Sequence, residues 1–390
     1  MQAPRPASVY RGIAVLAWNS FLLVAVANLI AMALLAAGLF APPATGPLRY
    51  GMDRLSVVYS HLDGHQIEEL LTETWGREYI YEPFVQHREA PQEGDWVNVD
   101  RHGFRRSRNQ GPWPPAASDA AVFVYGGSTT FGYGAADGET VPSRLQETLN
   151  RGGCERPVRV YNFGRGNYYS EQERVLFSSH LAAEKVPAAA VFVDGLNEWK
   201  DEPKFTAKLD YLMREPRSAL WVRAARALPL IELVRRVRDG ATRAEDAEPE
   251  EHAAAYGASA VDRWLVNRRM TAAIAAEFGV EVLFVWQPVP TYQYDLAHHL
   301  FRDESATAFA GHGPLQHGYA LLDARRGEDP QLEPAAGFLW LADLQIGRRE
   351  PLYVDAAHYS APFSREIAER IALSLAPGLG CGTTAAAQPE

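Results

Sequence analysis

The sequence predicts an α/β domain built on a doubly wound parallel sheet and preceded by an N-terminal transmembrane helix. The sheet is indicated by short, continuously apolar runs that alternate with stretches of helical periodicity. These runs span 121–125, 158–161, 189–193 and 280–286. Apolar runs of this length, separated by helices, are typical of parallel strands buried on both faces. The transmembrane helix is indicated by a long uncharged segment near the N-terminus.

This uncharged segment lies between Arg11 and Arg49 and is almost continuously apolar over 12–40. As a helix it exceeds the ~30 Å hydrocarbon core of a bilayer. The alternative is a cleaved signal peptide, whose apolar region is normally only about 7 to 15 residues long. Because Arg5 and Arg11 precede the segment, the positive-inside rule places the N-terminus in the cytoplasm. We therefore expect a single-pass anchor in the cell membrane, with the rest of the chain extracytoplasmic, in the periplasm.

The composition is that of a globular protein, since 47% of the 390 residues are hydrophobic and 22% are charged. The formal net charge is -10, which gives no broad basic field for a nucleic-acid backbone. A small or neutral substrate is more compatible with this net charge than a nucleic acid is. The two cysteines, Cys154 and Cys381, lack the clustered spacing of a zinc site. We expect neither a metal nor a cofactor.

The chain divides into four expected parts: a stub with the anchor, a linker or collar, the main domain, and a flexible tail. Their expected bounds are 1–45, 46–118, 119–378 and 379–390. The main domain carries an insertion at about 203–257, which is long for a connection in such a fold.

Helices are expected in each of the larger parts. The collar has one at 66–75, Thr140 can cap a second, and the last runs over 364–375. In the insertion, a basic amphipathic helix is expected near 220–237. The acidic, Ala-rich stretch 239–255 is interpreted as a solvated loop.

Polar residues follow each of the first three predicted strands. Ser128 stands in a glycine-flanked turn after the first, polar residues of 162–167 follow the second, and Asn197 follows the third. An Asp-x-x-His motif occupies 355–358. Because ligand sites in open α/β sheets lie at the carboxyl ends of the strands, we expect these residues to meet at one edge.

These blocks resemble those of the SGNH/GDSL hydrolase family, which are a Ser in a Gly-Asp-Ser-like turn, a Gly, an Asn in Gly-x-Asn, and Asp-x-x-His. The resemblance covers roughly 98–375 and follows the family's order. It implies a flavodoxin-like strand order and a serine ester hydrolase. Two positions depart from the pattern: Gly127 stands where the family usually has Asp, and Glu198 stands where Asp commonly follows the Asn.

A catalytic triad of Ser128, His358 and Asp355 is expected on chemical grounds as well. A serine hydroxyl becomes a useful nucleophile only with a base in reach, and His358 is the candidate base. Asp355 can fix the imidazole tautomer and stabilise the imidazolium. In isolation, these residues would be interpreted as a turn serine, a helix-start aspartate and a surface histidine.

The oxyanion of the tetrahedral intermediate needs preorganised donors. We expect these to be the backbone N–H of Ser128, the side chain of Asn197 and the backbone N–H of Gly166. Aligning on Asn162 instead puts Asn167 at the family's glycine, so the N–H of Asn167 is the alternative to that of Gly166.

Two other clusters contain side chains of types that bind ligands. His298 and His299, with His312 and His317, suggest a metal, but adjacent histidines do not share a helical face and no carboxylate spacing completes a site. The aromatic side chains of 286–294 can stack on a sugar ring or form a rigid, packed loop, and the sequence leaves both open.

Three functions remain. The first is an esterase that removes a small acyl group, such as acetyl, from an envelope or exported polysaccharide. The second is an acyltransferase that uses the same triad with a sugar hydroxyl in place of water. The third is a non-catalytic binding or assembly protein that retains the fold. A complete triad argues against the third.

The resemblance has a consequence for the two cysteines. In the implied strand order, the helix after the first strand and the final helix pack side by side, with their C-termini at the face opposite the site. Cys154 follows the first of these helices and Cys381 follows the second. In an oxidising compartment we expect a Cys154–Cys381 disulfide, the alternative being two free thiols.

Overall fold

The computed structural model of the protein describes residues 6–37, 46–199, 228–234, 250–302 and 313–382. The chain forms two compact units. The first joins 1–44 to 213–245, and the second joins 45–212 to 246–390.

The first unit contains the apolar helix α1 (Pro6–Ala36). Its segment Tyr10–Ala36 has a hydropathy of 2.1 and is long and apolar enough to cross a membrane. Asn28, inside this segment, donates to the carbonyl of Val24 at 2.8 Å and accepts the N–H of Leu230 at 3.1 Å. The side-chain amide of Asn28 is therefore satisfied within the unit.

Leu230 belongs to a short helical segment, 229–234, within the predicted basic helix. Of the other residues of the predicted helix at 220–237, only Leu228 is described and it forms a bend; the others lie outside the described residues, as do 239–249 of the acidic stretch. The last part of that stretch was wrongly interpreted as a loop, because helix α10 begins at Glu250. Alanine is the best helix former, and in this stretch it outweighs the local run of acidic charge.

The second unit is built on the predicted parallel sheet. Its strands are β3 (Ala120–Gly126), β4 (Val158–Gly164), β5 (Ala189–Asp194), β6 (Glu281–Trp286) and β7 (Phe338–Trp340). The strand order is β4-β3-β5-β6-β7, and all neighbours pair in parallel. This is the flavodoxin-like order. Strand β7 was not predicted, since a three-residue run carries too little periodicity.

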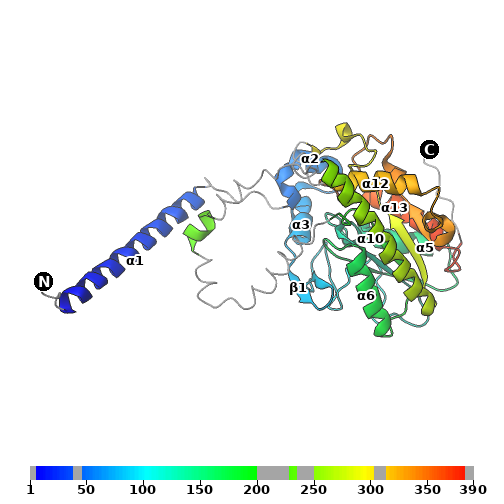
Figure 1. Ribbon diagram of the computed structural model, residues 1–390, viewed down its shortest axis with the longest axis horizontal. Coiled ribbons are helices and arrows are strands. Elements are labelled where there is room, and N and C mark those ends of the chain that lie inside the picture. The colour runs from blue at the N-terminus through cyan, green and yellow to red at the C-terminus, as the bar shows by residue number, and fades with distance from the viewer. Residues whose placement is uncertain (1–5, 38–45, 200–227, 235–249, 303–312, 383–390) are drawn as a thin grey trace. The chain divides into compact units, whose positions relative to one another are not determined.

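Helices cover both faces of this sheet (Figure 1). They are α5 (Val141–Arg151), α6 (Ser170–Ala182), α10 (Glu250–Glu277), α12 (Gly313–Arg325) and α13 (Ala361–Leu375). Alternate side chains of β3 divide between two cores: Val122 and Val124 pack with α5 and α13, whereas Phe123 and Tyr125 pack with α6 and α10. This alternation explains why β3 is apolar throughout.

Short helical turns complete the second unit. They are α4 (Ser128–Phe131), η2 (Asp137–Glu139), η4 (Leu296–His298), η6 (Pro330–Leu332), η7 (Pro334–Ala336) and η8 (Ala342–Gln345). The predicted cap of α5 is confirmed, because the Thr140 hydroxyl accepts the N–H of Ser143 at 3.3 Å.

The expected collar is part of the same compact unit as the sheet. Its elements are η1 (Gly46–Tyr50), α2 (Met52–Val58), α3 (Gly64–Trp75) and the antiparallel pair β1 (Tyr79–Glu82) and β2 (Gln86–Glu89). Arg105 joins the collar to the α/β domain. Its backbone N–H donates to Asn162 at 2.9 Å, and its buried guanidinium donates to the carbonyls of Gly132 and Ala135 at 2.6 Å.

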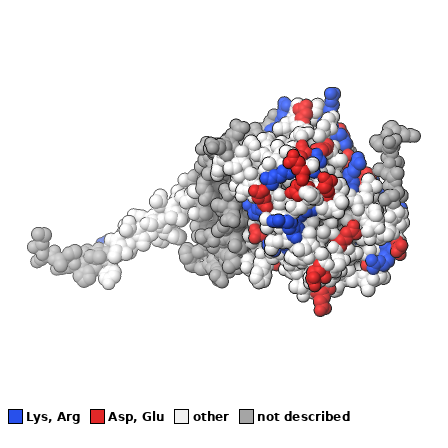
Figure 2. All heavy atoms as spheres, turned by 45° about the vertical axis from the view of Figure 1, so that its right-hand side comes forward, with Lys and Arg blue, Asp and Glu red and all other residues white. Residues whose placement is uncertain are grey.

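The expected disulfide between Cys154 and Cys381 is present, with a Cα–Cα distance of 3.9 Å. The two residues lie just beyond α5 and α13, which share one core. On the face of the α/β unit in view in Figure 2, acidic and basic side chains are intermingled.

Candidate active site

Ser128 lies at the carboxyl end of β3, where the chain turns directly into α4. It is the first residue of this helical turn and is 9% exposed. The N–H groups at the start of a helix have no intrahelical acceptor, so the N–H of Ser128 is suited to bind an oxyanion at this edge.

The structure brings Ser128, His358 and Asp355 together. Nε2 of His358 lies 2.8 Å from Oγ of Ser128, and Nδ1 lies 2.7 Å from Oδ2 of Asp355. Oδ1 of Asp355 also accepts the backbone N–H groups of Ala357 and His358, each at 2.9 Å. A carboxylate only accepts, so Nδ1 carries a proton and Nε2 can receive one from the serine hydroxyl.

The environment of Asp355 keeps it ionised. Burial pushes the pKa of this carboxyl up, but the charge of His358 and the three donated hydrogen bonds more than offset burial, so the pKa is lowered from its ordinary value. The carboxylate is therefore available to stabilise an imidazolium.

The imidazole of His358 packs against two aromatic rings, which also contact each other with centroids 5.0 Å apart. Tyr133 stacks on it with ring centroids 5.0 Å apart, and Trp75 meets it edge-on at 5.7 Å. Trp75 ends α3 and is 37% exposed, so the collar contributes directly to the site. Sequence reasoning missed Trp75, because a helix pattern does not say which distant element its last residue will contact.

Asn197 lies over the turn that carries Ser128. Its Nδ2 donates to the carbonyl of Tyr168 at 2.8 Å, and a Cβ added at Gly127 would lie 2.2 Å from this same nitrogen. A side chain at 127 would therefore require the Asn197 amide to shift.

The backbone of Gly166 is engaged in a way that the sequence did not suggest. Its N–H donates to Oε1 of Glu89 at 3.0 Å, which argues against the expected role of Gly166 as an oxyanion donor. The next residue, Asn167, has φ of 67°, a left-handed conformation that glycine adopts most easily. The N–H of Gly166 is therefore already paired, and Asn167 has a backbone conformation that is typical of glycine.

Three carboxyl groups, those of Glu173, Asp194 and Glu198, are buried beside the site. Glu198 accepts the N–H and the hydroxyl of Ser170 at 2.9 and 2.8 Å, and Asp194 accepts the indole N–H of Trp264 at 2.8 Å. Burial, followed by the charge of Asp194, raises the pKa of Glu198, and burial also raises the pKa of Asp194 and Glu173.

This carboxyl cluster predicts how stability depends on pH. A carboxyl whose pKa is raised by folding holds a proton that the unfolded chain has released, so stability falls as pH rises above the ordinary carboxyl pKa of about 4. We expect the free energy of unfolding to fall between about pH 5 and pH 8, and to fall less steeply in Glu198→Gln, whose neutral amide still accepts the N–H of Ser170. Denaturant unfolding at several pH values measures both slopes. Identical slopes would contradict the role of Glu198.

The other predicted clusters lie next to the triad: His299 interacts with Asp355 and Ala356, and Gln287 accepts the Thr129 hydroxyl at 2.6 Å. Trp286, Tyr292 and Tyr294 are buried, which favours the packed loop over a sugar platform. His299 is buried and stacks on Tyr353 with centroids 5.4 Å apart, whereas His312 lies outside the described residues. In the described part of the chain, no group of three or more His, Cys, Asp or Glu side chains is arranged to hold a metal ion.

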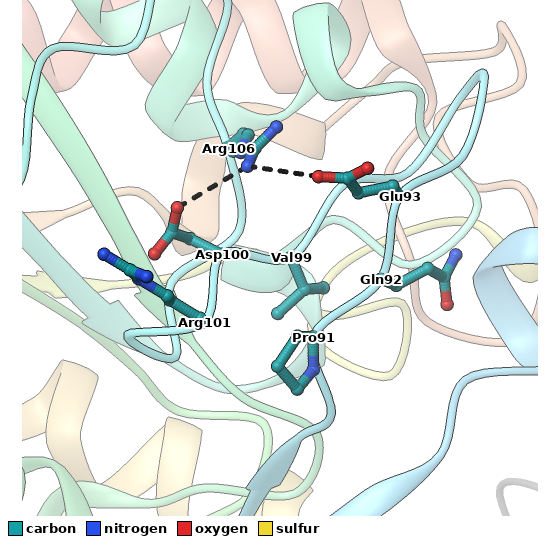
Figure 3. Close-up of a pocket in the computed structure, with 7 residues that line it drawn as sticks. All are labelled: Pro91, Gln92, Glu93, Val99, Asp100, Arg101 and Arg106. Atoms are coloured by element: carbon teal, nitrogen blue, oxygen red, sulfur yellow. Dashed lines mark ion pairs between the residues drawn. The ribbon is translucent and has the colours of Figure 1, made fainter.

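A cavity of about 500 Å³ lies in the collar and is lined by residues between 91 and 106 (Figure 3). Arg106 pairs there with Glu93 at 3.8 Å and with Asp100 at 3.6 Å. Ser128 and His358 do not line this cavity. It is therefore distinct from the candidate active site.

No protein-family model matches this chain, and no curated protein matches it significantly. Several solved structures do match. A lipase/acylhydrolase from Enterococcus faecalis is 14% identical, with 68% of this chain and 99% of that chain covered and a TM-score of 0.35. A lipase from a goat rumen metagenome is 14% identical, with coverages of 67% and 98% and a TM-score of 0.38.

A GDSL-like lipase from Bacteroides thetaiotaomicron is 13% identical, with coverages of 68% and 91% and a TM-score of 0.32. The solved structures that this chain is similar to thus include hydrolases of the GDSL type.

Proposed function

We propose that this protein is a membrane-anchored serine ester hydrolase in which Ser128, His358 and Asp355 form the catalytic triad. The observation that carries the proposal is the continuous pair of hydrogen bonds from Ser128 Oγ through the His358 ring to Asp355, at 2.8 and 2.7 Å. This is the geometry in which a serine hydroxyl is activated. A non-catalytic binding protein would have no need of it.

In the proposed reaction, Oγ of Ser128 attacks the ester carbonyl carbon while Nε2 of His358 takes the hydroxyl proton. The oxyanion receives hydrogen bonds from the N–H of Ser128 and the side-chain amide of Asn197. Collapse of the tetrahedral intermediate expels the alcohol, which takes its proton from Nε2 and leaves an acyl-serine. Water, deprotonated by His358, then attacks the acyl-serine and releases the carboxylic acid and Ser128.

We further propose that the substrate is an O-acyl ester, such as an acetyl ester of an envelope polysaccharide, reached on the outer side of the membrane. The length and apolarity of α1 and the basic residues Arg5 and Arg11 support anchoring with the N-terminus in the cytoplasm. The Cys154–Cys381 disulfide supports an oxidising, extracytoplasmic compartment for the α/β unit.

A fluorophosphonate probe tests the proposal, because it reacts with an activated serine and not with an ordinary hydroxyl. We expect the folded protein to incorporate one label, on the peptide that contains Ser128. The same protein unfolded in denaturant is the control and should remain unlabelled. A folded protein without label on Ser128 would overturn the hydrolase proposal.

Hydrolysis and acyl transfer share the acyl-serine and differ in the group that attacks it. A nitrophenyl acetate assay with increasing concentrations of a sugar acceptor separates them. For a hydrolase, we expect free acetate to equal released nitrophenol at every acceptor concentration. Acetyl-sugar formed at the expense of acetate would establish the transferase instead.

A further inference from the structure

Gln287 lies at the carboxyl end of β6, at the same edge of the sheet as Ser128. It is buried, and both of its backbone polar groups are engaged. Its N–H donates to the carbonyl of Asp194 at 3.0 Å, and its carbonyl accepts the hydroxyl of Tyr319 at 2.8 Å. The next residue is Pro288, which restricts the backbone of Gln287 to extended conformations. The side chain of Gln287 therefore extends from a fixed position.

The side-chain oxygen of Gln287 contacts two hydroxyls. Oε1 accepts the hydroxyl of Thr129 at 2.6 Å and lies 2.8 Å from the hydroxyl of Tyr359. The hydroxyl of Tyr359 is also 2.8 Å from the carbonyl of Pro288, so its one proton is shared between two acceptors. A single amide oxygen thus joins Thr129 to Tyr359.

These two hydroxyls belong to the residues that follow the nucleophile and the base. Thr129 directly follows Ser128, and Tyr359 directly follows His358. Ser128 and His358 are 230 positions apart and come from different elements, the first from the start of α4 and the second from the segment before α13. The oxygen of Gln287 therefore ties both segments to one point beside the Oγ–Nε2 contact.

Stability alone does not account for this arrangement. Thr129 and Tyr359 are each 3% exposed, and Gln287 is 1% exposed. Apolar side chains of the same shape would fill this space, and replacing both partners of a buried hydrogen bond in this way can be nearly neutral for stability. Apolar packing is non-directional, however, whereas a hydrogen bond fixes the distance and angle at which two groups meet. The bonds to Gln287 therefore supply alignment that packing would not.

We propose that Gln287 is a positioning residue that sets the distance between Oγ of Ser128 and Nε2 of His358, through the hydroxyls of Thr129 and Tyr359. The proposal rests on the function proposed above. The serine proton must pass to Nε2 as Oγ attacks the ester carbon, and a displacement of about 1 Å in such a geometry can cost about 10²-fold in rate. In this role Gln287 transfers no proton and forms no bond to the substrate.

The test replaces Gln287 by methionine, which is similar in length and lacks the amide oxygen. We expect kcat for ester hydrolysis to fall about tenfold to a hundredfold with KM nearly unchanged, because the alignment of Oγ and Nε2 acts in the chemical step and not in substrate binding. Fluorophosphonate labelling of Ser128 should slow by a similar factor.

Thr129→Val and Tyr359→Phe each remove one hydroxyl, keep the shape of the side chain and leave Gln287 in place. Each should lower kcat by a smaller factor than Gln287→Met does. Thr129→Ser, which keeps the hydroxyl, should retain more activity than Thr129→Val. Adding Thr129→Val to Gln287→Met should lower kcat little further, because the bond that it removes is already lost. A residue that only stabilised the fold would not give this pattern in kcat.

Gln146→Met is the matched control. Gln146 is buried on α5, and its Oε1 accepts the N–H of Val160 at 2.8 Å, so the substitution again removes an amide bond of a buried glutamine. It should lower the unfolding temperature and leave kcat of the folded protein unchanged. If Gln287→Met does not fold, Thr129→Val and Tyr359→Phe carry the measurement.

The outcomes distinguish the two proposals. If wild-type Ser128 is not labelled by the fluorophosphonate, both the hydrolase and the positioning role fail. If the wild type is labelled and a folded Gln287→Met reacts at the wild-type rate, the positioning role fails and the hydrolase stands. Wild-type rates in both Thr129→Val and Tyr359→Phe would have the same meaning. A rise in KM at constant kcat would also overturn the positioning role, since alignment of Oγ and Nε2 acts on the chemical step.

Discussion

Ser128→Ala is expected to lower kcat for ester hydrolysis by about 10⁶-fold, the scale found when a serine nucleophile is removed from a triad. The hydroxyl supplies the only covalent route in the proposed reaction, so the remaining donors can stabilise only a slower, direct attack by water. Initial rates with nitrophenyl acetate, together with fluorophosphonate labelling, measure the effect. Labelling should disappear altogether.

Ser178→Ala is the control for this experiment. Ser178 lies on α6, where its hydroxyl donates to the carbonyl of Arg174 at 2.8 Å, away from the proposed chemistry. Its activity should equal that of the wild type. If Ser128→Ala retained activity in a preparation free of other esterases, Ser128 would not be the nucleophile.

Asp355→Asn is expected to lower kcat by about 10⁴-fold while the fold is retained. Oδ1 of Asp355 accepts two backbone N–H groups, so the asparagine carbonyl will occupy that position and its NH₂ will face Nδ1 of His358. Nδ1 must then accept, which moves the proton to Nε2. A protonated Nε2 cannot take the proton of Ser128.

The measurement is kcat together with the unfolding temperature, with Asp262→Asn as a control in which an exposed aspartate undergoes the same change. The NMR signal of the imidazole should report the exchange of tautomers. Wild-type turnover in a folded Asp355→Asn protein would mean that Asp355 does not orient His358.

The fold was predictable because β3 to β6 each contain a mostly apolar run and are separated by helices with clear ends. Thr140 illustrates how local that information is, since its cap depends on residues three positions apart. Strand β7 escaped prediction because it has only three residues and gains its stability from pairing with β6. Local sequence signals therefore predict most of the helices and strands. They do not predict a strand such as β7, which depends on pairing with another strand.

The candidate site was predictable where its residues form short motifs, as Ser128, Asn197 and the pair Asp355 and His358 do. The contacts that the collar makes with the candidate site were not predictable from the sequence. Glu89 lies 77 positions from Gly166 and belongs to no motif, so nothing in its neighbourhood indicates which amide it will bind. For the same reason, the sequence did not indicate that the N–H of Gly166 is bound by a carboxylate of the collar.

The disulfide between Cys154 and Cys381 also limits when, during synthesis of the chain, this bond can form. The two cysteines are separated by 227 positions, and at the usual rate of synthesis of about 5 to 20 residues per second the second follows the first by roughly 11 to 45 s. During that interval Cys154 is a thiol without its partner, exposed to mispairing with other thiols. The bond can close only after Cys381, which follows α13, has been made. Oxidation of this pair therefore cannot guide any folding step that takes place before almost the whole chain has been synthesised.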